Sequence, residues 1–431
     1  MSTTDESPRV DEEKLDASPP SQRSPAPDGG LAAWTVVLGT WCTSFCSFGW
    51  LNSIGIFQEY YETTLLKQYS HSTISWIPSL QIFFMMGLGP VIGYLYDRVG
   101  TRNLLLAGSL LHVLGIMMTS LGTQYYQILL AQGVCSAVGV ACIFQPAVIS
   151  LGGWFDRHRG AAFGVAFTGS SLGGVVFPIL VGRLIDKVGF GWAMRIAGFL
   201  ILGLLVIANL TVRAYTPPQG SQHKQGKPSA LKALASNPLK ELDFVLLMAG
   251  LFLFNYGFFV VIDYLPVQAL AAGMDASLAG YILPILNAGS LFGRLASGVL
   301  GDKLGRYNTF IVVCSLTGLW TLCLWLPAGD HTPAIVAFAV LFGFFSGAFV
   351  SLIIPLVMQI SPLPELGIRN GIIMLAMAIS GLTTNPINGA IITHSGWPAL
   401  KIFAGVFCLA GTFSVLLIRV RQVGWHPLKR F

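Results

Sequence analysis

Apolar stretches of membrane-spanning length fill the chain from residue 31 onward and alternate with short polar segments. An α-helix needs about 20 mainly apolar residues to cross a hydrocarbon layer of about 30 Å. The pattern therefore predicts twelve membrane-spanning helices. They are expected at residues 33–57, 72–96, 103–121, 125–149, 160–182, 191–212, 243–270, 277–300, 307–327, 333–359, 368–393 and 397–418.

Polar segments divide these helices into two groups. Residues 1–30 hold seven acidic and three basic residues among many Ser and Pro, which predicts a disordered tail without a signal peptide. Residues 213–242 are rich in Pro and Lys and predict a linker. The predicted fold is an all-α integral membrane protein with two pseudo-symmetric six-helix bundles, residues 31–212 and 243–418. A short tail, residues 419–431, follows.

One ten-residue pattern occurs twice, with a Gly, an Asp, a basic residue and a second Gly in register. GYLYDRVGTR at residues 93–102 recurs 205 residues later as GVLGDKLGRY at residues 298–307, each time between two apolar stretches. Glycines allow close helix packing, and an Asp near a helix N-terminus is stabilised by the helix dipole. The repeat predicts two homologous halves whose short connections take part in conformational change. The candidate residues are Gly93, Asp97, Arg98, Gly100 and Arg102, with Gly298, Asp302, Gly305 and Arg306 in the second copy.

Composition excludes several functional classes. Hydrophobic residues make up 54% of the chain and charged residues 10%, whereas soluble proteins carry roughly 25% charged residues. The net charge of +6 comes from basic residues dispersed at helix ends, which argues against nucleic-acid binding. All seven cysteines lie in apolar stretches and are interpreted as packing residues.

The distribution of Lys and Arg predicts the orientation. Nineteen lie in the termini, the linker and the loops on the same side, and five lie on the opposite side. Because cytosolic loops carry the excess of positive charge, both termini and residues 213–242 are expected in the cytosol. The expected location is the plasma membrane.

The repeated decapeptide resembles the loop 2–3 signature of the major facilitator superfamily, GxLxDRxGxR. Its second copy resembles the weaker echo of that signature in loop 8–9. The resemblance implies two six-helix halves related as parallel repeats, transport by alternating access and no cofactor.

Further segments resemble a narrower family, the monocarboxylate porters. Pro27–Val37 is similar to the N-terminal signature of that family, and Trp154–Gly164 is similar to its second signature. Phe48–Ser53 and Phe57–Tyr61 most resemble the fungal branch. The resemblance covers residues 27–420 and does not specify a substrate.

The chain departs from the animal members of that family at two charged positions. The lysine of helix 1 that binds proton and carboxylate in those members is Asn52 here, and an Asp of helix 8 is Ser290. The helix 8 arginine is retained as Arg294. The animal mechanism of proton–lactate symport is therefore not implied.

Arg294 is the most informative charged residue within a predicted span. A guanidinium near the middle of a membrane helix costs at least about 2.5–3.5 kcal/mol on insertion scales, so it should face a cavity or a partner. Its planar fork suits a carboxylate. The preferred interpretation is an anion-binding residue on the substrate path, and the alternative is an internal ion pair with Asp302.

Other polar residues within the spans are weaker candidates. Those expected to bind substrate with Arg294 are Asn52, Gln145, Asn255, Tyr256, Asn287 and Asn385. Each has the alternative role of a hydrogen bond between helices. His112, Asp263 and Glu59 are candidates for proton coupling, against a packing role for the histidine and an interfacial role for both acids.

Motifs of enzymes are not found. The chain has no phosphate-binding loop, no metal-spaced His/Cys cluster and no paired nucleophile and base. The predicted function is gradient-driven transport of small organic, carboxylate-bearing molecules by a monomer without metal, with efflux of a fungal secondary metabolite preferred. Proton-linked uptake of a monocarboxylate or vitamin-like nutrient is one alternative. A non-transporting nutrient sensor is the other.

Overall fold

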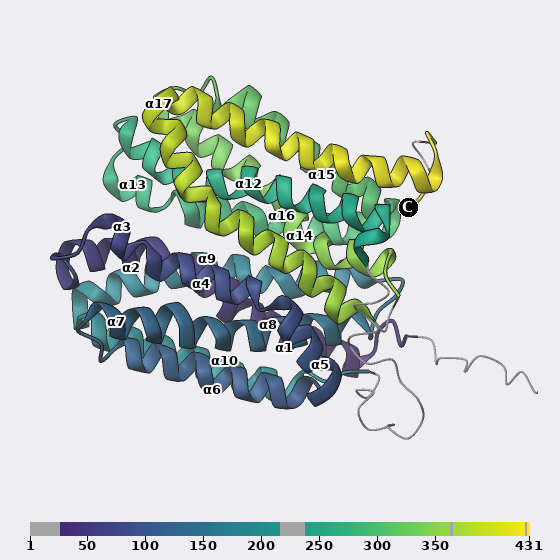
Figure 1. The fold of residues 1–431 in the computed structure, drawn as a ribbon, viewed down its shortest axis with the longest axis horizontal. Coiled ribbons are helices and arrows are strands. Elements are labelled where there is room, and N and C mark those ends of the chain that lie inside the picture. The colour runs from purple at the N-terminus through teal and green to yellow at the C-terminus, as the bar shows by residue number, and fades with distance from the viewer. Residues whose placement is uncertain (1–25, 216–237, 363–364, 427–428) are drawn as a thin grey trace, which may run out of the picture.

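The computed structural model describes residues 26–215, 238–362, 365–426 and 429–431. The side chains of His71 and Asp97 are outside this description. Most of the predicted N-terminal tail and the central part of the predicted linker also lie outside the described residues. Within the described ranges, every regular element is helical (Figure 1).

The first half of the chain forms one layer of helices, purple to teal in Figure 1. Short π-helical segments, labelled η, interrupt several of its spans. In chain order the elements are α1 (Leu31–Ser44), η1 (Phe45–Gly49), α2 (Ile54–Tyr60), η2 (Tyr61–Leu65), α3 (His71–Ile74), α4 (Trp76–Gly87), α5 (Gly89–Val99), α6 (Thr101–Thr119), α7 (Tyr125–Ile128), η3 (Leu129–Ser136), α8 (Ala137–Gly152), α9 (Arg159–Val188) and α10 (Phe190–Thr211).

The second half forms the other layer, green to yellow in Figure 1. Its elements are η5, a 3₁₀ turn (Pro238–Lys240), α12 (Leu242–Ala271), α13 (Ala276–Gly280), α14 (Ile282–Leu304), α15 (Arg306–Trp320), η6 (Thr321–Trp325), α16 (Thr332–Gln359) and α17 (Leu366–Val423).

The all-helical fold confirms the predicted class. Eleven helices in the described residues are long and apolar enough to cross a membrane. The last of them, α17, has 58 residues and would be about 87 Å long if straight. Gly396, at φ 75°, interrupts it, so α17 contributes two spans and the predicted twelve are present.

Several helix ends differ from the prediction; α9, for example, continues to Val188, beyond the predicted residue 182. The first span continues to Leu65 and the last to Val423, beyond the predicted residues 57 and 418. Counting apolar residues measures only the part of a helix inside the hydrocarbon layer, whereas backbone hydrogen bonds continue into the polar interface.

Glycines bring the two halves into backbone contact. A Cβ atom built on Gly89 of α5 would lie 2.6 Å from the Gly371 carbonyl oxygen of α17. One built on Gly160 of α9 would lie 2.5 Å from the Gly298 carbonyl oxygen of α14. No larger residue fits at these positions without separating the helices. Both contacts lie near the end of the molecule that carries residues 93–102 and 298–307, which we call the repeat-loop side.

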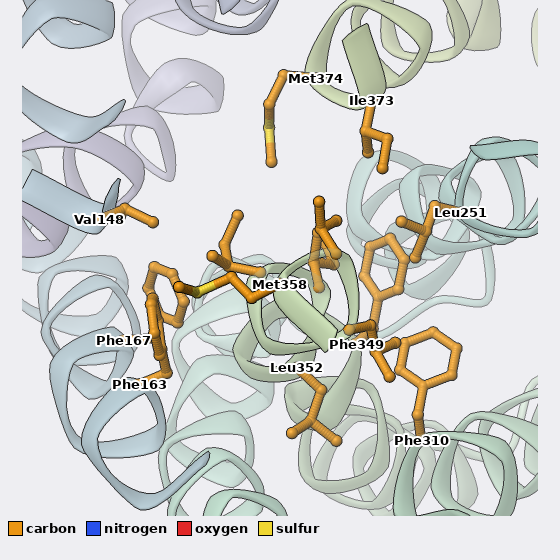
Figure 2. Close-up of a cluster of buried hydrophobic side chains, with 14 of the residues drawn as sticks. Val148, Phe163, Phe167, Leu251, Phe310, Phe349, Leu352, Met358, Ile373 and Met374 are labelled. Atoms are coloured by element: carbon orange, nitrogen blue, oxygen red, sulfur yellow. The ribbon is translucent and has the colours of Figure 1, made fainter. Parts of the chain in front are cut away.

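Apolar side chains from both halves also meet on the repeat-loop side, whereas two other large clusters each belong to a single half. Figure 2 shows part of the shared cluster: Val148, Phe163 and Phe167 from the first half with Phe349, Met358 and Met374 from the second. A Cβ on Gly152 of α8 would touch the Met358 side chain. The two halves are therefore closed against each other on this side.

The positions of the loops generate a topology prediction. We expect tags at either terminus or within residues 213–242 to be protected from protease added to sealed cells, because 19 of the basic residues lie on that side. A tag inserted in the segment that joins α12 and α13 should be digested. Digestion of a C-terminal tag on sealed cells would contradict this orientation.

The glycine contacts generate a second prediction. Gly93 is buried, and a Cβ there would lie 2.7 Å from the carbonyl carbon of Gly367. We expect Gly93→Leu to prevent full closure and to lower transport at least about tenfold, while overpacking costs about 1–3 kcal/mol of stability. Transport should be divided by surface abundance. Gly203→Leu is the matched control, since its Cβ meets nothing within 4 Å. Equal losses of transport and abundance would indicate a purely structural role.

Candidate functional site

Arg294 lies on α14 between the two halves and is 6% exposed. Its Nε donates to the Ser290 hydroxyl one turn earlier, at 3.1 Å. Its Nη1 donates to the Phe167 carbonyl oxygen on α9, at 2.5 Å, and to the Ser170 hydroxyl. These partners are neutral. Among the described residues no carboxylate forms an ion pair with Arg294.

The alternative interpretation, an ion pair between Arg294 and Asp302, is not what the structure has. Asp302 faces the start of α9, where its two carboxylate oxygens accept from the backbone N–H groups of Gly160 at 2.8 Å and Ala161 at 2.7 Å. Arg306 pairs with the same carboxylate at 3.3 Å. Among the described residues Arg294 therefore has no carboxylate counter-ion, which leaves its charge available to an anionic ligand.

Asn52 and Asn287 form a hydrogen bond across the halves. The Asn287 Nδ2 donates to the Asn52 Oδ1 at 2.9 Å, and the Asn52 Nδ2 donates to the Phe48 carbonyl oxygen. Asn52 lies where the first span departs from α-helical geometry, between η1 and α2. Local departures of this kind are frequent at functional sites. The structure thus brings together two residues that are 235 positions apart.

Gln145 is a buried amide without a partner. It lies on α8, is 1% exposed, and neither its oxygen nor its nitrogen has a hydrogen-bond partner among the described residues. A buried amide left unpaired costs roughly 1–3 kcal/mol. Its neighbours along the helix, Phe144 and Val148, belong to the apolar cluster shared by the halves. Gln145 is thus suited to a polar group supplied from outside the protein.

Asn255 and Tyr256 hold helices together within the second half. The Asn255 Nδ2 donates to the Met377 carbonyl oxygen at 3.1 Å and to the Ser380 hydroxyl at 2.7 Å. The Tyr256 hydroxyl lies 2.5 Å from that of Thr383. All these contacts join α12 to α17. The geometry favours the alternative role, a hydrogen bond between helices, over a substrate contact.

Asn385 and Asp263 lie together towards the other side of the membrane. Asn385 is exposed, and its backbone carbonyl accepts from the hydroxyl of Tyr264, the residue that follows the half-buried Asp263, at 3.2 Å. Glu59 is exposed at the corresponding end of the first half. In the described part of the chain, Arg294 hydrogen-bonds Ser290, Phe167 and Ser170 and none of these three residues.

His112 is fixed inside the first half. Its Nδ1 lies 2.9 Å from the Ser136 hydroxyl and its Nε2 lies 3.1 Å from the Cys46 carbonyl oxygen. A carbonyl can only accept, so Nε2 carries the proton and Nδ1 accepts from the serine. Both ring nitrogens are occupied, which favours packing over proton coupling.

The repeated decapeptides have matching conformations. Gly100 and Gly305 have φ values of 82° and 100°, and each ends one helix and begins the next. Such left-handed positions favour glycine. Arg98 stacks 4.4 Å over the Tyr94 ring, and Arg102 is exposed. In the second copy, Arg306 also donates to the Asp156 carbonyl oxygen in the other half at 2.6 Å.

Residues 27–37 and residues 154–164, the two segments that resemble family signatures, contact each other through Asp28. The Asp28 Oδ1 accepts from the N–H groups of Asp156 at 2.6 Å, Arg157 at 2.8 Å and His158 at 3.5 Å. Burial acts to raise the pKa of the Asp28 carboxyl, but these donors outweigh it and keep the pKa below its ordinary value. Sequence reasoning singled out both segments but not their contact. It also missed Ser170 and the Phe167 carbonyl, although the small-residue run at 168–174 marks that part of α9.

Two six-span halves that pack around buried polar residues and close on one side have the architecture of a membrane carrier. The chain belongs to the Major Facilitator Superfamily, since the family model so described matches residues 36–337 and 329–430. The narrower monocarboxylate porter family is not identified by this match.

Similar proteins include named fungal transporters. The chain is 54% identical over 421 residues to the MFS transporter asaE of Aspergillus flavus, covering 97% of this chain and 93% of that protein. It is 49% identical over 425 residues to the fujikurins efflux protein of Gibberella fujikuroi, covering 98% and 90%.

The fold is also similar to that of the solved transporter FucP, described in the outward conformation. The TM-score is 0.70 at 16% identity, and the alignment covers 89% of this chain and 98% of FucP. At this identity the likeness concerns the fold.

The contact between Asp302 and α9 generates a prediction. A carboxylate at a helix N-terminus contributes about 0.3–1 kcal/mol, and up to about 2 kcal/mol when partly buried. We therefore expect Asp302→Asn to lower the equilibrium constant between the closed and open states of the repeat-loop side by about twofold to thirtyfold. Transport should slow accordingly. Asp186→Asn, which changes an exposed acid near the other end of α9, is the control. Transport per molecule at the cell surface is the measurement, and an unchanged value would exclude the proposed contribution of Asp302.

Proposed function

We propose that this protein exports a carboxylate-bearing fungal secondary metabolite by gradient-driven alternating access. The relatives support the export part, because one of them is named as an efflux protein for fujikurins. Arg294 supports the carboxylate part. A buried guanidinium whose described partners are all neutral attracts an anion that enters the space between the halves.

The single observation that carries this proposal is the set of partners around Arg294. Its Nη1 is directed to α9 of the other half, while Ser290 holds its Nε. An incoming carboxylate can replace the neutral acceptors with a charge-assisted, bidentate contact. Gln145 and the Asn52–Asn287 pair supply further polar groups for the rest of the molecule.

The orientation in the membrane follows from the distribution of charge. The repeat-loop side is cytosolic, because it carries the excess of Lys and Arg. We infer that the protein acts in the plasma membrane as a monomer, since one chain contains both halves.

The segments 27–37 and 154–164, which contact each other through Asp28, support a place in the fungal branch of the monocarboxylate porters. If protons drive export, Asp263 is the better candidate, because both nitrogens of His112 are occupied.

The role of Arg294 is tested by substitution. We expect Arg294→Ala to lower transport of aromatic carboxylic acids about a hundredfold, since hydrogen bonds to charged groups contribute about 1.5–3 kcal/mol. Arg294→Lys should raise KM about tenfold or more, because lysine keeps the charge but loses the planar fork. Inside-out and right-side-out membrane vesicles prepared from the same cells give the direction of transport. The corresponding neutral amides should be poor substrates of the unchanged protein.

Arg195→Lys serves as the control. Arg195 donates to the Ser120 hydroxyl within the first half and stacks on Trp192, so this variant should transport normally. Arg294→Lys transport equal to that of the unchanged protein would show that a point charge suffices, and the proposed bidentate contact with a carboxylate would be wrong. Faster movement into right-side-out vesicles than into inside-out vesicles would instead favour uptake.

A further inference from the structure

We propose that Asp28 and Glu241 are a matched pair of positioning residues for closure on the repeat-loop side. Each acid stands just before the first membrane helix of its half, α1 or α12. Each binds the region where the fifth span of the same half begins. In both halves, that region is the surface on which the opposite half closes.

In the first half, Asp28 holds the loop that leads into α9. One carboxylate oxygen accepts the N–H groups of Asp156 and Arg157, and the Asp28 N–H donates to the Trp154 carbonyl oxygen at 3.1 Å. Asp28 has φ 53°, a left-handed conformation that is uncommon for a residue with a side chain. The contacts on both sides of the residue maintain this conformation and fix the loop.

In the second half, Glu241 holds the start of the fifth span through Arg369. The two Glu241 oxygens accept from the Arg369 Nη1 at 2.7 Å and Nη2 at 2.5 Å, in a bidentate pair. The Arg369 Nε donates to Glu365 at 2.9 Å. Arg369 is only 1% exposed. A buried guanidinium that is bonded through all three nitrogens has little freedom to move, so it fixes the first turn of α17.

The start of α9, held by Asp28, and the start of α17, held by Glu241, are the segments that contact the opposite half. Beside Asp28, the backbone at Gly160 and Ala161 binds Asp302, and the Asp156 carbonyl oxygen accepts from Arg306. Beside Arg369, Gly367 and Gly371 lie against the backbone of Gly93 and Gly89. The partners of Asp28 and Glu241 all lie in their own half. They therefore act on closure through the helix starts that they fix.

The proposal is tested by the accessibility of the closed region. Met358, in the shared apolar cluster, is 7% exposed. We would place a single cysteine there, in a chain whose seven native cysteines are replaced, and label it with an impermeant maleimide in inside-out vesicles. Asp28→Ala and Glu241→Ala should each raise the labelling rate about fivefold or more, the lower range of a coupling between sites. This readout depends on neither the substrate nor the direction of transport.

Asp243→Ala is the matched control. Asp243 lies two residues after Glu241, but its carboxylate accepts from Arg421 and Gln422 at the end of α17 and not from the start of the fifth span. It should leave the labelling rate unchanged. Combining Asp28→Ala with Asp302→Ala should add little to either single change, because both act on the start of α9. An unchanged rate in the Asp28 and Glu241 variants, or an equal increase in the Asp243 variant, would overturn the proposal.

Discussion

The absence of water from the membrane interior is the constraint on which the rest of this structure depends. Each polar group inside must find a partner in the protein or in a ligand. Most groups here do so within their own half, as His112, Asn255 and Tyr256 illustrate. Arg294 differs because its Nη1 reaches across to the other half and finds neutral acceptors there. This charge, with neutral partners only among the described residues, is the reason for proposing an anionic substrate.

The same constraint explains why the two halves meet through glycines. An interface that opens and closes in a membrane exposes backbone and side chains in turn, so long side chains that interlock across it would resist separation. Gly89 with Gly371 and Gly160 with Gly298 place backbone against backbone instead. Close approach increases the van der Waals contact between smooth helix surfaces. The two pairs lie on different helix pairs of the interface, which gives the closed state two similar contacts.

The sequence predicted the fold well and the site in part. Apolar length located the spans, and the duplicated decapeptide indicated the two halves; both signals are local. Arg294 was identifiable because a charge within an apolar span is costly. Its partners Phe167 and Ser170 were not, since they depend on how two helices about 125 residues apart are rotated against each other. The contact of Asp302 with α9 was missed for the same reason, and the ion pair considered in its place is not formed.

Different forces set different properties of the closed state. The shared cluster around Phe349 and Met358 packs apolar side chains of the two halves against each other and contributes van der Waals contact to the closed state. Apolar contacts are not directional, however, and would tolerate several alignments of the helices of one half against those of the other. The two bonds from Gly160 and Ala161 to the Asp302 carboxylate contribute about 1.5–3 kcal/mol each, because their acceptor is charged. Because they require one geometry, they select one alignment, and their modest strength allows the closure to reverse in every transport cycle.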